Sequence, residues 1–353
     1  MVETTIKSKN YEMNMENKWE ESMDLINEFL EYKKKLGKSK SLIKNYRYDV
    51  LHFLKNTNIK NVKKILIEDI EDYIAILRRN RCAGSTINRR ICAIKSLIRY
   101  LRRKNHRLLR RAKRKTHADP AYLDKIRALI EEYDDILEIE SVRAVKKEKL
   151  PFSMEELDVM LKEIKKDENN RYSNTAMRNY LIIKLSAIGT GARNTAVRKL
   201  LISDLPCANC SNNCSNCIPT IKLHRKGKRE FNKNKIRVRI KKEVCKELKA
   251  FIGKSESLDE NKPVFVSRKS NFLSIAQMNR ILQKSMRLAN IEKRGRTFHS
   301  LRHTFITEGI KNGTPWGHMM IQVDHKAKLG ITGKYEHMQP EDLNIKFPSL
   351  PNS

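Results

Sequence analysis

Thr297-Phe-His-Ser-Leu-Arg-His303 is the most informative stretch of this 353-residue sequence. His299 and Arg302 stand three positions apart at the start of a predicted helix, so their side chains share one face. A guanidinium beside the imidazole would repel a metal ion, whereas it can donate two hydrogen bonds to phosphate oxygens. The pair therefore favours a phosphate ligand, although a lone His-x-x-Arg pair is a weak signal and is more often an ordinary surface pair.

Other chemically active residues flank this stretch on both sides. Upstream lies Gly189-Thr-Gly-Ala-Arg193, followed by a short predicted helix; downstream lie Asp324-His325 and Tyr335-Glu-His337. Tyr335 is the only one of the eleven tyrosines that follows Tyr180. If the C-terminal half uses a tyrosine located after His-x-x-Arg, Tyr335 is the one candidate.

The charge of the chain points to a polyanionic partner. Lys and Arg total 74 against 41 Asp and Glu, a formal net charge of +33. Nucleic acid is the first expectation, and a highly charged surface without a special partner is the alternative. No run of eighteen apolar residues occurs and the N-terminus is polar. We therefore expect a soluble, cytoplasmic protein with no membrane association.

The N-terminal half predicts a helical, basic domain. Between Trp19 and Arg103 apolar residues recur at helical spacing in four segments, the last expected to begin with Ser85 as its N-cap. The polar face of this fourth segment carries basic residues, which we predict to contact DNA phosphates: Arg89, Arg90, Lys95, Arg99 and Arg102. From Arg102 to Lys115, nine of fourteen residues are Lys or Arg and none is acidic.

A further helix is predicted from Pro120 to Glu138, and the sequence leaves open whether it extends the first domain or bridges the two. A second domain begins near Lys147, where Ser153 and Glu156 form a predicted capping box. Helices are expected over 175–188, 194–201, 241–252, 275–289, 299–311 and 315–323. The β-branched segments 219–223 and 235–240 flank a basic turn, which predicts a hairpin.

The predicted fold is therefore mainly α with a small β-hairpin, an α+β class. Its expected parts are a flexible N-terminus (1–18), a helical DNA-binding domain (19–115), and a linker with a helix (116–146). A mixed catalytic domain (147–338) and a C-terminal tail (339–353) follow. The tail is expected either to dock on a neighbouring protomer or to be a loose terminus.

The order of these residues resembles the tyrosine recombinases, or phage-type integrases, including the Xer-like site-specific recombinases. The resemblance is strongest from Phe152 to Met338, and the four-helix N-terminal segment looks like the SAM-like core-binding domain of that family. It implies a two-domain, C-shaped protein around double-stranded DNA. It also implies a homotetramer acting on two DNA sites and the fold of the DNA breaking-rejoining enzymes.

The resemblance implies a role for each matching residue. Arg193 and Arg302 would bind the non-bridging oxygens of the scissile phosphate, and His325 would be a third phosphate-binding residue. Lys226, with Lys228 as the alternative, would protonate the leaving 5′ oxygen. His299 would assist deprotonation of the nucleophile, and Tyr335 would be that nucleophile.

Elementary chemistry fits this set. Two guanidiniums and a lysine can stabilise the charge on a pentavalent phosphorus without a divalent ion, so no catalytic cofactor is expected. The sequence departs from the family in three places. Ala196 stands where the family has an acidic residue three positions after the first arginine, and Asp324 stands where it has glycine. The interval from His325 to Tyr335 is about one residue longer than usual.

Four cysteines form a compact cluster with the spacing of a thiolate metal site: Cys207, Cys210, Cys214 and Cys217. We interpret it as an inserted structural zinc knuckle between Asp204 and the hairpin. An iron–sulfur cluster and a loop without metal are the alternatives.

The resemblance predicts an enzyme that cuts and rejoins DNA at specific sites through a 3′-phosphotyrosine intermediate. One alternative is a type IB topoisomerase, which shares the chemistry and relaxes DNA as a monomer; the N-terminal half disfavours it. Another is a DNA-binding protein on the same fold that does not cleave DNA. The joint presence of all six catalytic groups favours the enzyme.

Overall fold

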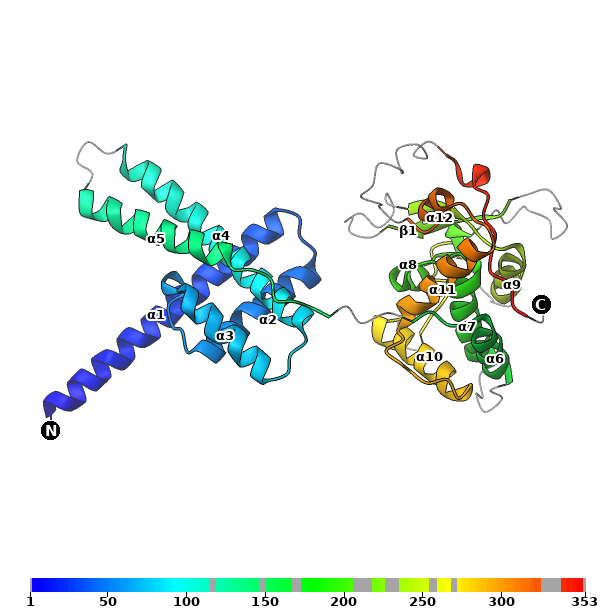
Figure 1. The fold of residues 1–353 in the computed structure, drawn as a ribbon, viewed down its shortest axis with the longest axis horizontal. Helices are drawn as coiled ribbons and strands as arrows, with labels where there is room; N and C mark the ends of the chain where they lie inside the picture. Colours follow the sequence, from blue (N-terminus) through cyan, green and yellow to red (C-terminus); the bar gives the residue numbers. More distant parts are fainter. Residues whose placement is uncertain are drawn as a thin grey trace. The chain divides into compact units, whose positions relative to one another are not determined.

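The computed structural model describes residues 2–114, 119–145, 150–166, 173–205, 218–225, 235–253, 259–267, 272–324 and 338–351; for residues 2–18 only the helical backbone is described. The chain divides into two compact units, Met1–Lys147 and Glu148–Ser353 (Figure 1). Each unit has its own hydrophobic core. The predicted fold class, mainly helical with one small antiparallel sheet, is confirmed.

Helices are the regular secondary structure of the first unit in its described part. It contains α1 (Val2–Lys35), α2 (Lys40–Thr57), the short 3-10 turn η1 (Val62–Lys64), α3 (Ile67–Arg79), α4 (Gly84–Ala112) and α5 (Pro120–Glu138). Phe29, Phe53 and Tyr73 are fully buried at its centre. Tyr133 and Ile136 of α5 belong to the same core, so α5 extends the first unit.

Two details of this unit differ from the sequence-based predictions. Helix α1 begins at Val2 and not at Trp19, because residues 2–18 contain no Gly or Pro to stop a helix although they lack an apolar stripe. Helix α4 begins at Gly84, so Ser85 lies inside its first turn and is not the N-cap. Ala83, in an extended conformation, is the N-cap residue instead.

The second unit combines helices with one two-stranded sheet. Strands β1 (Thr220–His224) and β2 (Lys235–Arg239) pair antiparallel with Lys222 opposite Arg237, which confirms the predicted hairpin. The other elements are α6 (Met154–Lys166), α7 (Ser173–Lys184), the π turn η2 (Leu185–Gly189), α8 (Asn194–Arg198), η3 (Ile202–Asp204), α9 (Lys242–Ile252), α10 (Ile275–Leu288), α11 (Phe298–Lys311), α12 (Trp316–Gln322) and η5 (Pro340–Asp342).

The N-terminus of α6 follows its prediction closely. The Ser153 backbone N–H donates to Glu156 Oε2 over 2.9 Å, and the Glu156 N–H donates to Ser153 Oγ over 3.1 Å. These two reciprocal bonds make the capping box that the sequence indicated.

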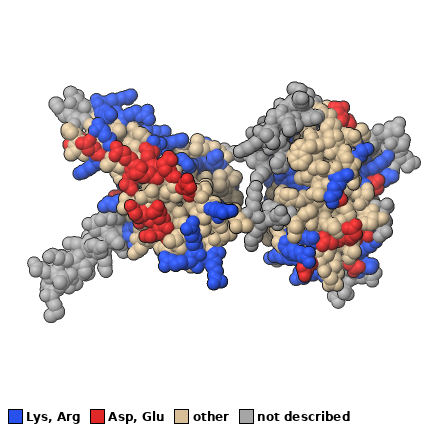
Figure 2. All heavy atoms as spheres, viewed as in Figure 1, with Lys and Arg blue, Asp and Glu red and all other residues tan. Residues whose placement is uncertain are grey.

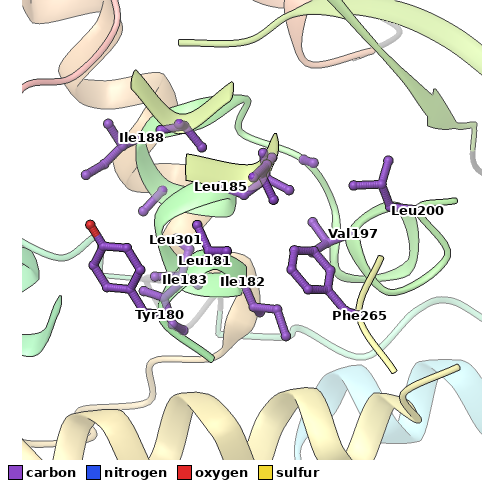
Figure 3. Close-up of a cluster of buried hydrophobic side chains, with 14 of the residues drawn as sticks. Tyr180, Leu181, Ile182, Ile183, Leu185, Ile188, Val197, Leu200, Phe265 and Leu301 are labelled. Atoms are coloured by element: carbon purple, nitrogen blue, oxygen red, sulfur yellow. The ribbon is translucent and has the colours of Figure 1, made fainter. Parts of the chain in front are cut away.

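The core of the second unit anchors the segments that carry the predicted site. Val197 of α8 and Leu301 of α11 are fully buried and lie in one cluster with Leu181, Ile182 and other apolar side chains (Figure 3). Leu301 precedes Arg302, and Val197 follows Arg193 by four residues. The packing of these apolar side chains therefore fixes the backbone from which both arginines project.

The C-terminal segment packs on its own unit. Leu343 and Ile345 are buried in a small cluster with Phe305, Met319 and Met320. The Lys241 side chain donates to the Pro348 carbonyl oxygen over 2.9 Å. The described part of the tail is thus held by residues of the same chain, so it is not the loose terminus that was one of the two expectations.

Candidate active site

Arg193 and Arg302 come from separate elements and meet at the same loop. Arg193 is the N-cap residue of α8, and Arg302 lies in the second turn of α11. Arg302 Nη1 donates to the Gly191 carbonyl oxygen over 3.0 Å, and Nη2 donates to the Val323 carbonyl oxygen. Arg193 Nη2 donates over 2.7 Å to the carbonyl oxygen of Asp324, the residue that follows Val323. The two guanidiniums therefore hold successive carbonyl groups at the end of α12.

The turn before Arg193 requires a residue without a side chain. Gly191 has a φ of +67°, and a Cβ atom added there would lie 2.5 Å from Phe305 Cδ1. Phe305 is itself fully buried. Gly191 thus allows the turn to lie against α11, which brings Arg193 and Arg302 together.

The charge of Arg302 is destabilised by its surroundings. The residue is 3 % exposed, and the pKa of its guanidinium is lowered to about 10. Burial is the main cause, the positive charge of Arg193 acts in the same direction, and the carboxylate of Asp324 opposes the shift. A buried cation beside another cation gains from a nearby anion. A phosphate group is an anion suited to such a pair.

His299 lies at the start of the same helix. Its side chain is exposed, and its ring stands perpendicular to that of His303 with a centroid separation of 4.7 Å. His299 and Arg302 both belong to α11, three positions apart, as the sequence predicted. The imidazole of His299 is therefore exposed on the helix that carries Arg302.

Three of the predicted catalytic residues, Lys226, His325 and Tyr335, lie outside the described residues, as does the alternative Lys228. The residues before two of them are described and interact. Arg225, which precedes Lys226, lies 3.0 Å from a carboxylate oxygen of Asp324, which precedes His325. The segments that lead to Lys226 and His325 therefore meet at Arg193.

Arg225 and Asp324 are site residues that no pattern in the sequence indicates. In the sequence, Asp324 only replaces the glycine that the related family has, and Arg225 only belongs to a basic turn. Their contact joins positions 99 residues apart, which no local pattern reveals. The usable signal was their place directly before Lys226 and His325.

The basic face predicted on α4 is partly used inside the first unit. Arg89 pairs with Asp49, and Arg90 is 9 % exposed with Nη1 3.3 Å from His52 Nδ1. Lys95 donates to the carbonyl oxygens of Leu137 and Ile139 at the end of α5.

Two predicted members of this face remain. Arg102 pairs with Asp134 of α5 over 2.6 Å, and Arg99 is exposed to solvent. Acidic side chains gather in one area of the first unit and basic side chains lie around them, as Figure 2 shows. Helix α5 supplies several of the negative charges of this unit, because its second half contains Glu131, Glu132, Asp134, Asp135 and Glu138.

No group of three or more potential metal ligands occurs within the described ranges. The four cysteines predicted to bind zinc, Cys207, Cys210, Cys214 and Cys217, lie outside those ranges. Among the helices that the structure describes, none has both the length and the apolar character needed to cross a membrane.

Comparison with known proteins connects the two units to one family. Residues 135–342 match the model of the Phage integrase family, and residues 26–105 match that of the Phage integrase N-terminal SAM-like domain. Tyrosine recombinase XerH of Campylobacter jejuni subsp. jejuni serotype O:2 is 32% identical over 199 residues, which are 56% of this chain and 51% of XerH. The match thus spans about half the length of that relative.

Solved structures share the fold at low sequence identity. XerH site-specific recombinase bound to difH substrate, in a pre-cleavage complex, matches with a TM-score of 0.55 and 18% identity over 81% of this chain and 74% of that one. The Tn1549 transposon integrase in complex with circular intermediate DNA matches with a TM-score of 0.57 and 14% identity over 90% and 96% of the two chains.

A lambda integrase tetramer bound to a Holliday junction also matches, with a TM-score of 0.57 and 12% identity over 87% of this chain and 78% of that one. These structures agree in fold with both units of the chain. Since the integrase family model covers more than half of its residues, this chain belongs to the phage integrase family.

Proposed function

We propose that this chain is a site-specific DNA recombinase that cuts and rejoins DNA strands through a covalent 3′-phosphotyrosine. The observation that carries the proposal is the convergence of Arg193 and Arg302 on the carbonyl groups of Val323 and Asp324. Two guanidiniums held together at a loop are suited to bind the non-bridging oxygens of one phosphate. Membership of the phage integrase family supports the same reading.

In the proposed reaction the phenolic oxygen of Tyr335 attacks the scissile phosphorus. A new O–P bond forms and the bond to the 5′ oxygen breaks, so the 5′ oxygen leaves as a hydroxyl after it takes a proton from Lys226. His299 assists removal of the tyrosine proton, and His325 binds the phosphate with the arginines. The 5′ hydroxyl of a partner strand then attacks the phosphotyrosine and releases Tyr335, so the phosphodiester is conserved without ATP.

The arginines stabilise the charge that develops during this step. The pentavalent phosphorus gathers negative charge on its equatorial oxygens. The buried, positively charged guanidinium of Arg302 can stabilise that charge. Removal of one such donor in an enzyme of this kind costs about 10²-fold or more in rate. No cofactor is needed for this chemistry.

We propose double-stranded DNA as the substrate and a homotetramer on two DNA sites as the working assembly. The net charge of +33 supports a polyanionic partner. Of the predicted α4 residues, the exposed Arg99 is the best placed to contact phosphates. The other four already interact with groups inside the first unit: Arg89, Arg90, Lys95 and Arg102.

A structural zinc ion at Cys207, Cys210, Cys214 and Cys217 is a further part of the proposal. Four thiolates at this spacing complete a tetrahedral site and leave no position for a substrate, so the metal would have no catalytic role. An iron–sulfur cluster bound by the same four cysteines is the alternative to zinc. Elemental analysis of protein purified under reducing conditions distinguishes them, and protein with neither zinc nor iron would contradict a metal site.

The test of the function is capture of the covalent intermediate. A library of nicked suicide duplexes with a randomised segment is incubated with the protein, and adducts that resist SDS are recovered and sequenced. We expect adducts with the wild type and none with Tyr335→Phe. Tyr122→Phe, which changes an exposed tyrosine on α5, is the matched control and should form adducts normally.

Each other outcome has a defined meaning. Adducts that persist in Tyr335→Phe would show a different nucleophile. DNA binding without any adduct would instead support a DNA-binding protein that does not cleave. Relaxation of supercoiled DNA by monomers would support topoisomerase activity.

A further inference from the structure

The carboxylate of Asp324 lies between two guanidiniums. One oxygen, Oδ2, is 3.3 Å from Arg193 Nη1, and the other, Oδ1, is 3.0 Å from Arg225 Nε. The Asp324 side chain is 16% exposed, against 24% for Arg193 and 42% for Arg225. Each carboxylate oxygen therefore binds one arginine. Arg225 is the more exposed of the two, and none of the predicted catalytic roles belongs to it.

The backbone of Asp324 is strained where it supports this contact. Its φ is +48°, in the left-handed region that favours glycine, and its N–H donates to the Ile321 carbonyl oxygen at the end of α12. A non-glycine residue at such a helix end costs about 1 kcal/mol relative to glycine. The side chain of Asp324 thus remains at a position where glycine is the residue that fits best, which indicates that the carboxylate has a use.

The positive charges of the arginines around Asp324 are stabilised by a nearby anion. Arg193, Arg225 and Arg302, here called the arginine cluster, bring three positive charges to one loop. Ala196, three residues after Arg193 on α8, offers no carboxylate. Asp324 raises the pKa of Arg302 against the opposing effects of burial and Arg193, so its charge acts on this arginine as well.

We infer that Asp324 is a positioning residue whose carboxylate orients Arg193 and holds Arg225 beside it as a third phosphate-binding guanidinium. This inference rests on the proposed recombinase function. Arg193 keeps N–H groups that do not contact Asp324, because a guanidinium has five, so a phosphate can bind while the carboxylate stays in place. Orientation of this kind matters because a displacement of about 1 Å at a reacting group can cost ~10²-fold in rate.

The experiment measures the rate of covalent adduct formation at saturating DNA, together with the Kd for the same duplex and the thermal unfolding of each variant. Asp324→Asn removes the charge, and Asp324→Gly also removes the backbone strain. We expect both to lower the rate by ~10-fold or more while the Kd changes by less than ~3-fold. The glycine variant should unfold at the wild-type temperature or above it.

Arg225→Gln tests the second half of the inference. It should also lower the rate, and the double variant with Asp324→Asn should be no slower than Asp324→Asn alone, because the two residues act through one contact. Glu163→Gln, which removes a carboxylate from the Glu163–Lys166 pair on α6, is the matched control and should keep the wild-type rate.

The outcomes separate this inference from the function on which it rests. Variants that form adducts at the wild-type rate would overturn the role of Asp324 and leave the recombinase intact. Tighter DNA binding with an unchanged rate would also overturn it, since the carboxylate would then compete with phosphate. If the wild type itself forms no adduct, the proposed function fails and the role of Asp324 fails with it.

Discussion

Gly191 shows how a single residue determines the geometry of the candidate site. It has a left-handed φ of +67° and no room for a Cβ atom, which would lie 2.5 Å from the ring of Phe305. Gly295 has a similar φ of +73°, but a Cβ atom there would meet nothing within 4 Å. The two glycines therefore separate the cost of the backbone conformation from the cost of contact with α11.

We expect Gly191→Ala to destabilise the protein by about 2–4 kcal/mol, as the sum of a conformational cost of about 1 kcal/mol and an overpacking cost of about 1–3 kcal/mol. Gly295→Ala should cost only the first part. Urea unfolding of both variants measures the difference. Equal destabilisation of the two would show that the contact with Phe305 contributes nothing.

At the scale of single residues, the sequence indicated the site through short-range patterns only. Arg193, His299 and Arg302 stand in recognisable local contexts, and the structure brings the two arginines to one loop. The pairing of Arg225 with Asp324 depends on how the hairpin and α12 pack in three dimensions. Such long-range contacts leave no periodicity in the sequence, so they could not be predicted from it.

At the scale of the helices, the contact between α4 and α5 shows that not every basic residue on one helix face is available to bind DNA. Lys95 donates to two carbonyl oxygens at the C-terminal end of α5, where helices have unsatisfied acceptors. Arg99, one turn further along α4, is exposed. The same face thus contains a residue that supports the fold and a residue available to DNA.

Substitution of these two residues should have opposite consequences. Lys95→Met should lower the free energy of unfolding by about 1–2 kcal/mol, because the carbonyl groups lose a charged donor. Arg99→Gln should leave stability unchanged, weaken DNA binding, and reduce the slope of log K against log salt by about one. Thermal unfolding and salt titration of DNA binding test both, and an unchanged salt slope in Arg99→Gln would exclude it as a phosphate contact.

His52 links three helices of the first unit, and its lowered pKa predicts that the stability of this unit depends on pH. Its Nδ1 lies 2.7 Å from the Tyr73 hydroxyl and 3.3 Å from Arg90 Nη1, and Asn56, Asp49, Lys55 and Tyr48 also lie around it. Burial, and then the charge of Arg90, lower the pKa of His52 below its usual 6.5. The unfolded chain therefore binds a proton more readily than the folded one.

Stability from this group is complete above pH 6.5 and falls as the pH decreases from 6.5 toward the lowered pKa of His52. We expect His52→Gln to flatten this part of the profile while stability above pH 7.5 shifts by a constant amount. Chemical unfolding of the full chain between pH 5 and 8 gives both slopes. An equally steep loss in the variant would assign the pH dependence to other groups.

The elements themselves were largely predictable, and the exceptions have physical causes. The hairpin and α5 have strong local signals, namely β-branched alternation around a turn and Pro at the first helical position. Helix α1 was underestimated because residues 2–18 have no apolar stripe. The assignment of α5 to the first unit depends on the burial of Tyr133 and Ile136 beside α4, which periodicity alone does not reveal.

At the scale of the whole molecule, the chain consists of two units with separate cores. Residues 1–147 contain the core built around Phe29, Phe53 and Tyr73, and residues 148–353 contain the core around Val197 and Leu301. All six predicted catalytic residues lie in the second unit, whereas the basic face of α4 lies in the first. The proposed chemistry therefore belongs to the second unit, and the proposed phosphate contact of Arg99 belongs to the first.

This division predicts that residues 148–353 alone fold cooperatively and still form the phosphotyrosine adduct, but only at low salt or high protein concentration. Loss of the phosphate contacts that we propose for the first unit should weaken DNA binding by about tenfold or more at 0.15 M salt and reduce its salt dependence. Circular dichroism, adduct capture and salt titration of the fragment test this, with its Tyr335→Phe variant as the control. A fragment that binds DNA as tightly as the full chain would show that the first unit does not contribute to affinity, and one that fails to fold would show that the two cores depend on each other.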